Sequence, residues 1–393
     1  MCSRFLYHGP KVGKKLHLIA WQDTCLPTCF GGLGIPDMAS LTHGFACSFI
    51  WRFYNSTSLV SDWFRFRYSS PFKPASTNCS KFWKNICGVA RNIKGNIRIS
   101  VNAKNCSSLS FFWDPWLNNI SLADLIPSSP ALHGAISDYW NNTWSLPDKI
   151  PTEIQQLILA IPFMDINDET ITWNGIVKPC FKIFRFNLFV DRQKVPWYKF
   201  IWHKRAALRF SSFTWLLVKD GLKLADVLAR RNIFIEAICP LCNSVEESGS
   251  HVFFQCDYSF AVISHLLPVL DSFLFRPTIL QLFDFIDELS IYNKVEKDYC
   301  FFVICAAVYF IWKERNNRRF SDSHLTHLEL RQNLILAVSR KWSGSKYWER
   351  CLSGFFSGSV LAMHFLTVSL LGAFRLAALW FLGDMAGCSF PSC

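Results

Sequence analysis

The stretch that decides how the second half of this chain folds reads Cys239-Pro-Leu-Cys-Asn-Ser-Val-Glu-Glu-Ser-Gly-Ser-His-Val-Phe-Phe-Gln-Cys256. Three cysteines and one histidine stand in it with the spacing C-x2-C-x8-H-x4-C. Two cysteines separated by two residues can place both sulfurs on one metal ion from a single tight turn. The interval between His251 and Cys256 suits the first turns of a helix, with Ser248 or Ser250 as its N-cap.

Three thiolates and one imidazole complete a tetrahedron and leave no position for water, so the pattern predicts a structural zinc site and not a catalytic one. The expected ligands are Cys239, Cys242, His251 and Cys256. One alternative is a redox CxxC after a strand at 234–238, but a long helix should then follow, and 243–250 is polar, glycine-containing loop material. Another is four buried side chains without a metal.

The composition indicates a folded chain from a reducing compartment. Its 393 residues suffice for two or three domains, and 51% hydrophobic against 18% charged residues excludes a disordered chain. The 16 Trp and 37 Phe need a thick core, a partner surface or a stacking surface. No continuous apolar segment opens the chain, so we expect no signal peptide and a nuclear or cytoplasmic location. The 16 cysteines then indicate metal or redox chemistry before disulfides.

The net charge of +12 is distributed in blocks. Residues 81–98 hold five Lys or Arg and no acid, and 199–231 hold eight against two acids. Residues 313–350 hold nine against four acids, whereas 122–170 carry seven acids and one Lys. Separate basic blocks could face a polyanion such as nucleic acid. The alternative is ordinary solvated surface.

Hydrophobic periodicity predicts a mainly α fold with small β elements (α+β), in which a small zinc-knuckle module is set among helices. The expected helices are at 38–54, 151–163, 197–204, 258–275 and 298–321. Residues 96–101 and 108–113 look like two strands joined by a polar turn. We interpret Gly31-Gly-Leu-Gly34 as a tight turn, because it lacks the Lys-Ser/Thr of a phosphate loop.

A hydrophobic tail occupies 351–393. Residues 355–374 carry no full charge and are long enough to span a bilayer, so 355–383 could anchor the chain in a membrane. The alternatives are a buried helix or a tail of unselected sequence.

A series of short sequence motifs, in their order along the chain, resembles the zinc-binding domain at the C-terminal end of plant non-LTR (LINE-type) retrotransposon reverse transcriptases. They are Trp197, Phe213-Thr-Trp-Leu-Leu217, Leu222, Asp226, Leu228-Ala-Arg-Arg231, Cys239-Pro-Leu-Cys242, Glu246-Glu247 and His251-Val-Phe-Phe-Gln-Cys256. The preceding part is similar to the region after the polymerase thumb in those proteins, through Trp21, Cys25, Pro27, Gly31-Gly-Leu-Gly-Ile35, Trp51-Arg52, Trp83 and Phe112-Trp-Asp-Pro-Trp-Leu117. Ile311-Trp-Lys-Glu-Arg-Asn316 and Arg318-Arg-Phe320 resemble the helix often found after the knuckle.

The resemblance implies a division of the chain into five parts. They are a remnant of the post-thumb region at 1–121, a linker at 122–150, the reverse-transcriptase-type zinc-binding domain at 151–275, a helical extension at 276–350 and the tail at 351–393. The chain lacks the Tyr-x-Asp-Asp polymerase motif, an endonuclease and an RNase H-like acidic set after 321, and Thr28 stands where the family has Lys. We therefore expect a non-catalytic fragment of a retrotransposon polyprotein, with no small-molecule substrate.

The same resemblance implies RNA or DNA as partner. The residues expected to contact phosphates are Lys204, Arg205, Arg209, Lys223, Arg230 and Arg231. Trp202 or Trp215 could stack on bases if exposed, although their apolar neighbours favour the core. The alternatives are a tail-anchored membrane protein and a zinc module with protein partners only.

Overall fold

The computed structural model describes residues 18–127, 132–162, 164, 171–264, 266–267, 269–270, 276–321 and 323–342. The described chain is mainly helical with one small two-stranded sheet, as expected. It divides into two compact units, which we call the knuckle unit (residues 18–34 and 194–342) and the aromatic unit (residues 35–193).

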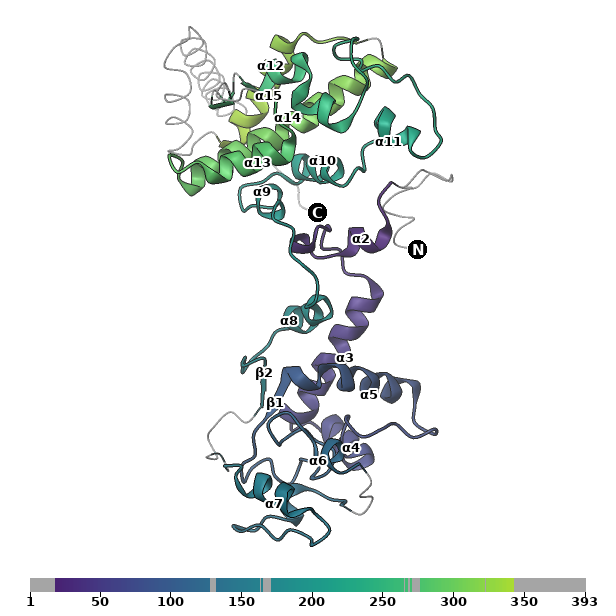
Figure 1. The fold of residues 1–393 in the computed structure, drawn as a ribbon, viewed down its shortest axis with the longest axis vertical. Helices are drawn as coiled ribbons and strands as arrows, with labels where there is room; N and C mark the ends of the chain where they lie inside the picture. The colour runs from purple at the N-terminus through teal and green to yellow at the C-terminus, as the bar shows by residue number, and fades with distance from the viewer. Residues whose placement is uncertain are drawn as a thin grey trace, which may run out of the picture. The chain divides into compact units, whose positions relative to one another are not determined.

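The knuckle unit is all helix around the Cys239–Cys256 stretch (Figure 1). Its helices are α2 (Trp21–Cys25), α9 (Tyr198–Ile201), α10 (Leu208–Val218), α11 (Ala225–Ala229), α12 (Asp257–Ser264), α13 (Ile279–Glu288), α14 (Lys294–Phe320) and α15 (His327–Trp342), with short turns η1 (Thr28–Phe30) and η5 (His251–Gln255).

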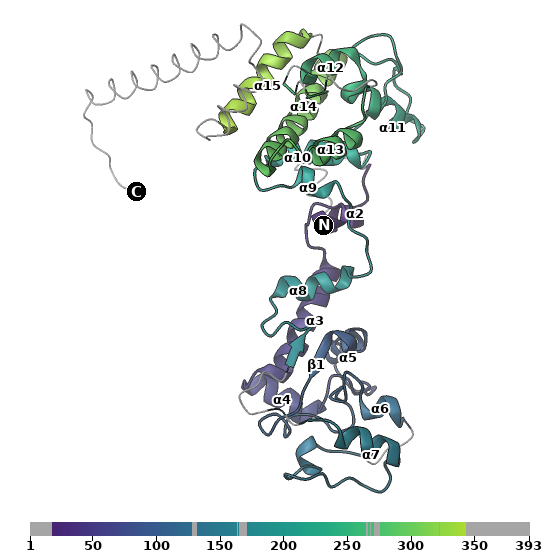
Figure 2. The same cartoon turned by 60° about the vertical axis from the view of Figure 1, so that its left-hand side comes forward.

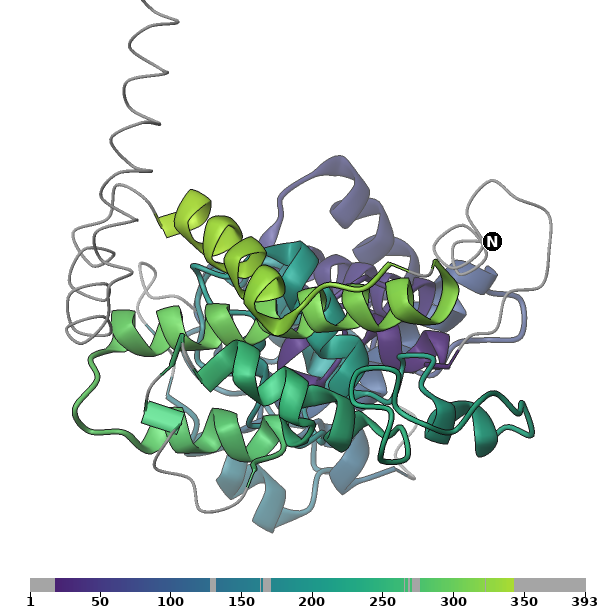
Figure 3. The same cartoon turned by 90° about the horizontal axis from the view of Figure 1, so that it is seen from above.

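The long helix α14 is the centre of this unit. Asn293 caps it by accepting hydrogen bonds from the N–H groups of Val295 and Glu296. All side chains from 298 to 308 are buried, because α9, α10, α13 and α15 pack around this half of the helix. Seen from above, α10, α12, α14 and α15 lie together (Figure 3). A helix that is apolar on every side needs this central position.

The glycine run at 31–34 forms the expected tight turn and belongs to the knuckle unit. A Cβ on Gly32 would lie 2.0 Å from the carbonyl oxygen of Leu26, so no other residue fits there. Gly31 and Gly34 have positive φ. The indole of Trp215 on α10 donates a hydrogen bond of 2.9 Å to the carbonyl of Gly31, which fixes the turn against the helices.

The aromatic unit packs its helices around a cluster of buried aromatic side chains. Its elements are α3 (Met38–Asn55), α4 (Leu59–Tyr68), α5 (Lys81–Ile93), η2 (Lys94–Asn96), β1 (Ile97–Ile99), α6 (Leu122–Leu125), η3 (Ile136–Asp138), α7 (Thr152–Leu159), β2 (Ile171–Trp173), α8 (Phe181–Phe186) and η4 (Asn187–Phe189). Helix α3 contacts α8, α4 and α5 (Figure 2). Gly44 allows the α3–α8 approach, since a Cβ there would meet the Phe181 ring at 3.1 Å.

The strand pairing differs from the prediction. Strand β1 pairs antiparallel with β2, with Ile97 opposite Trp173 and Ile99 opposite Ile171. The expected partner, 108–113, is a series of turns. Asp114 explains the difference, because its buried carboxylate accepts a 2.7 Å hydrogen bond from the N–H of Ser110 and folds this segment back on itself.

The segment at 122–150, expected as a linker, contributes buried side chains to the core of the aromatic unit. They are Leu122, Leu132, Ile136 and Ile150. The five-part division of the chain remains a prediction.

No helix within the described residues is long and apolar enough to cross a membrane. The hydrophobic tail at 351–393 lies outside the described residues, as does the end of the helix expected at 258–275, so the membrane-anchor hypothesis remains a prediction.

Candidate metal centre

The first two predicted ligands lie in a turn at the start of a small hairpin-like loop. Ile238 and Glu246 form an antiparallel bridge, and the N–H of Cys239 donates to the carbonyl of Val245 at 2.8 Å. The turn closes where Asn243, with a φ of 54°, donates to the carbonyl of Cys239. Asparagine tolerates this left-handed conformation better than most residues, so the local sequence suits the turn.

The second pair of ligands is not on one continuous helix, which corrects the expectation from the x4 spacing. Ser248 caps the short turn η5, because its hydroxyl accepts a hydrogen bond from the N–H of His251. Ser248 is one of the two residues that the sequence suggested as the cap. Helical geometry then breaks at Phe253 and at Phe254, which is fully buried with a φ of 82°. A left-handed buried aromatic residue is strained, and we attribute its persistence to the packing around it. The break turns the chain so that Cys256 starts the next helix.

Cys256 acts as an N-terminal cap of α12. The backbone N–H groups of Tyr258 and Ser259 interact with its sulfur and favour the thiolate. The positive end of a helix dipole favours a thiolate in the same way. The position therefore suits a metal ligand even before a metal binds.

The four predicted ligand atoms come together. They are the sulfurs of Cys239, Cys242 and Cys256 and a ring nitrogen of His251, and all lie within 4.8 Å of one another. The distance from Cys242 Sγ to His251 Nε2 is 3.3 Å. Tetrahedral zinc with Zn–S near 2.3 Å and Zn–N near 2.0 Å requires S···S separations of about 3.8 Å and S···N separations of about 3.5 Å. A cluster of this size and donor set fits zinc.

The protonation of the cluster is uneven without a metal. The thiol of Cys239 donates toward Cys256, and this hydrogen bond, together with burial, raises the pKa of Cys239. The same hydrogen bond lowers the pKa of Cys256 to about 6. Burial opposes ionisation of Cys242, but hydrogen bonds from Ser244 and His251 lower its pKa overall. Zinc binding would displace the remaining thiol protons, so zinc affinity should fall in acid.

The loop between the two ligand pairs is held by a buried ion pair that the sequence did not reveal. The carboxylate of Glu247 receives Nε and Nη2 of Arg315 at 2.5 and 2.7 Å, and both residues are buried. It also accepts from the N–H of Ala225 at 2.9 Å. This bidentate pair fixes the loop that carries the predicted ligands, residues 239–256, which we call the knuckle, to the end of α14.

Two further arginines on the last turn of α14 hold the backbone around the first two ligands. Arg318 donates to the carbonyls of Pro240 and Leu241 at 3.3 and 3.0 Å. Arg319 donates to the carbonyls of Glu236 and Ile238 at 2.9 and 3.2 Å. Apolar spacing and the resemblance at 311–320 both predicted this helix, but the sequence placed these arginines in a basic block and did not indicate that they hold the backbone around the ligands.

The six residues predicted to contact phosphates all lie in the knuckle unit, but three of them already have a charged or hydrogen-bonding partner within it. Arg205 is paired with Asp298 at 2.6 Å, and Arg230 with Asp220 at 3.3 Å. Arg231 donates to the carbonyl of Leu18 at 2.8 Å. The other three are exposed and form no ion pair with any described residue: Lys204, Arg209 and Lys223.

Neither tryptophan proposed for stacking presents a free ring. Trp215 is 2% exposed and hydrogen-bonded to Gly31, and Trp202 packs against the core of the unit. Both therefore serve the core.

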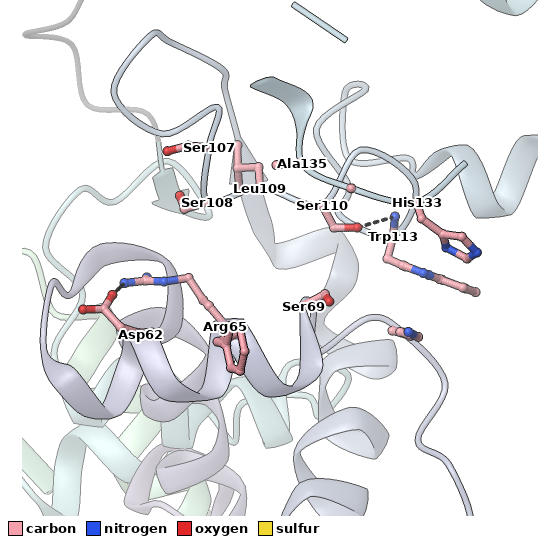
Figure 4. A pocket seen from close by; sticks show the side chains of 13 residues that line it. Asp62, Arg65, Ser69, Ser107, Ser108, Leu109, Ser110, Trp113, His133 and Ala135 are labelled. Atoms are coloured by element: carbon pink, nitrogen blue, oxygen red, sulfur yellow. Dashed lines mark hydrogen bonds and ion pairs between the residues drawn. The ribbon is translucent and has the colours of Figure 1, made fainter. Parts of the chain in front are cut away.

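The aromatic unit contains a hollow of about 650 Å³ between α4 and the 107–113 and 133–135 segments (Figure 4). Arg65 lines it, but this guanidinium donates to the carbonyls of Phe53 and Ser56 and pairs with Asp62. The hollow brings together none of the predicted site residues. The Cys239 cluster is the one group of three or more His, Cys, Asp or Glu side chains placed to hold a metal ion in the part of the chain described.

Comparison with known proteins identifies the part of the chain that carries the cluster. Residues 176–262 match the family described as zinc-binding in reverse transcriptase. This segment is therefore similar to reverse-transcriptase zinc-binding domains. All four clustered ligands fall inside the match, whereas the arginines of α14 that hold the domain's knuckle lie beyond it.

A weaker similarity extends over a longer part of the chain. Over 287 residues the chain is 20% identical to an Arabidopsis thaliana protein described as "Putative ribonuclease H protein". The alignment covers 67% of this chain and 46% of that protein, so the chain spans less than half of its relative's length. No solved structure matches the chain significantly.

Proposed function

We propose that this chain is a non-catalytic, nucleic-acid-associated part of a plant LINE-type retrotransposon reverse transcriptase polyprotein, in which zinc holds the domain in shape. The observation that carries the proposal is the closed Cys3His cluster inside a reverse-transcriptase zinc-binding domain. Four protein ligands leave no open position on the metal, so the site suits a structural role.

The proposed contact surface uses the predicted cations that form no ion pair within the described part of the chain. Lys204, Arg209 and Lys223 are exposed, and none of them forms an ion pair with a described residue. The guanidinium of Arg209 lies 5.9 Å from the centre of the Tyr309 ring, which leaves its N–H groups without a described acid. Arg205 and Arg230 contribute less in this proposal, because Asp298 and Asp220 already neutralise them. Arg231 supports the fold through Leu18. Binding would then be electrostatic, independent of sequence and sensitive to salt.

Fluorescence anisotropy of the zinc-loaded full chain with labelled single-stranded RNA tests this proposal. The variant K204Q/R209Q/K223Q should bind more weakly and should lower the slope of log K against log salt by about 2, since each lost phosphate contact removes about 0.7. A matched control with the same loss of charge in the same unit is K294Q/K313Q/K341Q, because these lysines are also exposed. Equal effects of the two variants, or a wild-type affinity that does not depend on salt, would reject the surface.

The alternative with protein partners only predicts a different outcome. In that case the chain binds zinc but shows no RNA or DNA binding at low salt.

A further inference from the structure

The outer face of α5 in the aromatic unit is basic from end to end. Lys81, Lys84 and Arg91 are exposed on it and form no ion pair with any described residue. They follow a helical spacing that places them on one side, and Lys81 and Arg91 lie about 15 Å apart along the axis. The opposite side is the buried one, with Trp83, Ile86, Cys87, Ala90 and Ile93 in the core.

No acid balances this face from within the helix. The helix contains no Asp or Glu, and its first turn, where an acid would be favourable, begins with Lys81 after the Ser80 cap. Lys94, directly after the helix, is different because it pairs with Asp124. The aromatic unit thus neutralises the cation next to the face and leaves the face itself uncompensated.

Gly88 leaves an open space in the middle of the same face. It lies between Lys84 and Arg91 in the helical spacing, and a Cβ there would meet nothing within 4 Å. Glycine inside a helix costs about 1 kcal/mol relative to alanine, and here no described part of the chain uses the space. A gap without a side chain in the middle of a basic face allows the backbone of an external partner to approach closely.

We infer that the α5 face is a second nucleic-acid contact surface, which binds the phosphate backbone of a single strand through Lys81, Lys84 and Arg91 across the gap at Gly88. Lys84 also donates to the carbonyl of Thr77, which holds its side chain at the surface while leaving further N–H donors for a phosphate. Asn85 and Asn92 are exposed beside the cations and can donate to phosphate oxygens. This surface lies in a different unit from Lys204, Arg209 and Lys223 and does not depend on the zinc site.

The test uses the zinc-loaded full chain and a fluorescein-labelled single-stranded oligouridylate RNA. K81Q/K84Q/R91Q should weaken binding about tenfold or more at about 0.1 M salt and lower the salt slope by about 2. The matched control K104Q/K149Q/K178Q removes the same charge from exposed lysines elsewhere in the aromatic unit. This control variant should change the affinity for RNA and the salt slope much less. Equal effects of the two triple variants would overturn the inference.

Gly88→Ala separates a contact surface from a merely solvated helix face. Alanine should raise the thermal stability of the aromatic unit, because it favours the helix, and should at the same time weaken RNA binding severalfold. A variant that is more stable and binds RNA as well as the wild type would contradict the inference. If K204Q/R209Q/K223Q weakens binding and K81Q/K84Q/R91Q does not, the α5 surface fails while the proposed function stands. The reverse result supports the α5 surface and rejects the one on the knuckle unit.

Discussion

At the scale of single residues, Asp114 is a titratable group held by hydrogen bonds inside the aromatic unit. It is fully buried and accepts hydrogen bonds from Tyr54, Ser70 and the N–H of Ser110. Burial raises its pKa to about 6, although these donors oppose the shift. The carboxylate closes the turn that replaces the expected strand at 108–113, so the same residue determines the local fold and its pH response.

We expect Asp114 to make the aromatic unit less stable as pH rises. A folded pKa above the unfolded value means that the folded state binds the proton more tightly, so the contribution is fully present below about pH 4 and is lost as pH rises through about 6. The loss is about 3 kcal/mol at most. Urea unfolding followed by tryptophan fluorescence checks this. The difference in free energy of unfolding between wild type and D114N should become smaller from pH 4 to pH 7. The corresponding difference for D148N, at an exposed aspartate, should not follow this trend. A difference for D114N that is constant over this range would contradict the assignment.

At the scale of elements, the knuckle and α14 form one structure. The four predicted zinc ligands stand at the two ends of the loop 239–256. Arg315, Arg318 and Arg319 hold the middle and the start of this loop. The family match ends at 262, but the contacts that position the knuckle extend to 319. A fragment that stops at the end of the match would lack them.

Glu247→Gln should therefore destabilise the zinc-loaded protein although no ligand is touched. Removing one partner of a buried pair leaves Arg315 uncompensated and costs about 3–5 kcal/mol. The neighbouring Glu246 is exposed, so E246Q is a matched control with little expected effect. Thermal unfolding of both variants by circular dichroism measures the difference. Similar melting temperatures for the two would show that the pair does not support the knuckle.

The sequence predicted the elements better than their pairing. The helices at 38–54 and 298–321 were visible because their apolar spacing is regular, and the structure has them as α3 and α14. The four clustered side chains were predictable because metal ligation restricts their spacing. The β1–β2 pairing was not, since it joins residues 97–99 to 171–173 over a long intervening segment. The Glu247–Arg315 pair spans 68 residues, and although both residues stand in motifs of the family resemblance, the sequence did not indicate that they pair with each other.

At the scale of the whole molecule, the two units should respond differently to loss of zinc. Structural zinc contributes directly to folding free energy, and its cluster lies entirely in the knuckle unit. Chelation should raise amide hydrogen exchange across 194–342 and leave 35–193 nearly unchanged, with protection restored when zinc is added back. Hydrogen exchange with mass spectrometry resolves the two ranges. A uniform change along the chain, or none, would contradict a zinc-dependent knuckle unit.

We propose that Cys239, Cys242, His251 and Cys256 form one closed zinc site. X-ray absorption at the zinc edge, together with metal content per chain, tests it most directly. We expect one zinc ion per chain with three sulfur neighbours and one nitrogen neighbour, no bound water, and loss of the metal in C239S/C256S. A folded chain without zinc, or zinc bound mainly by oxygen and nitrogen, would contradict the account.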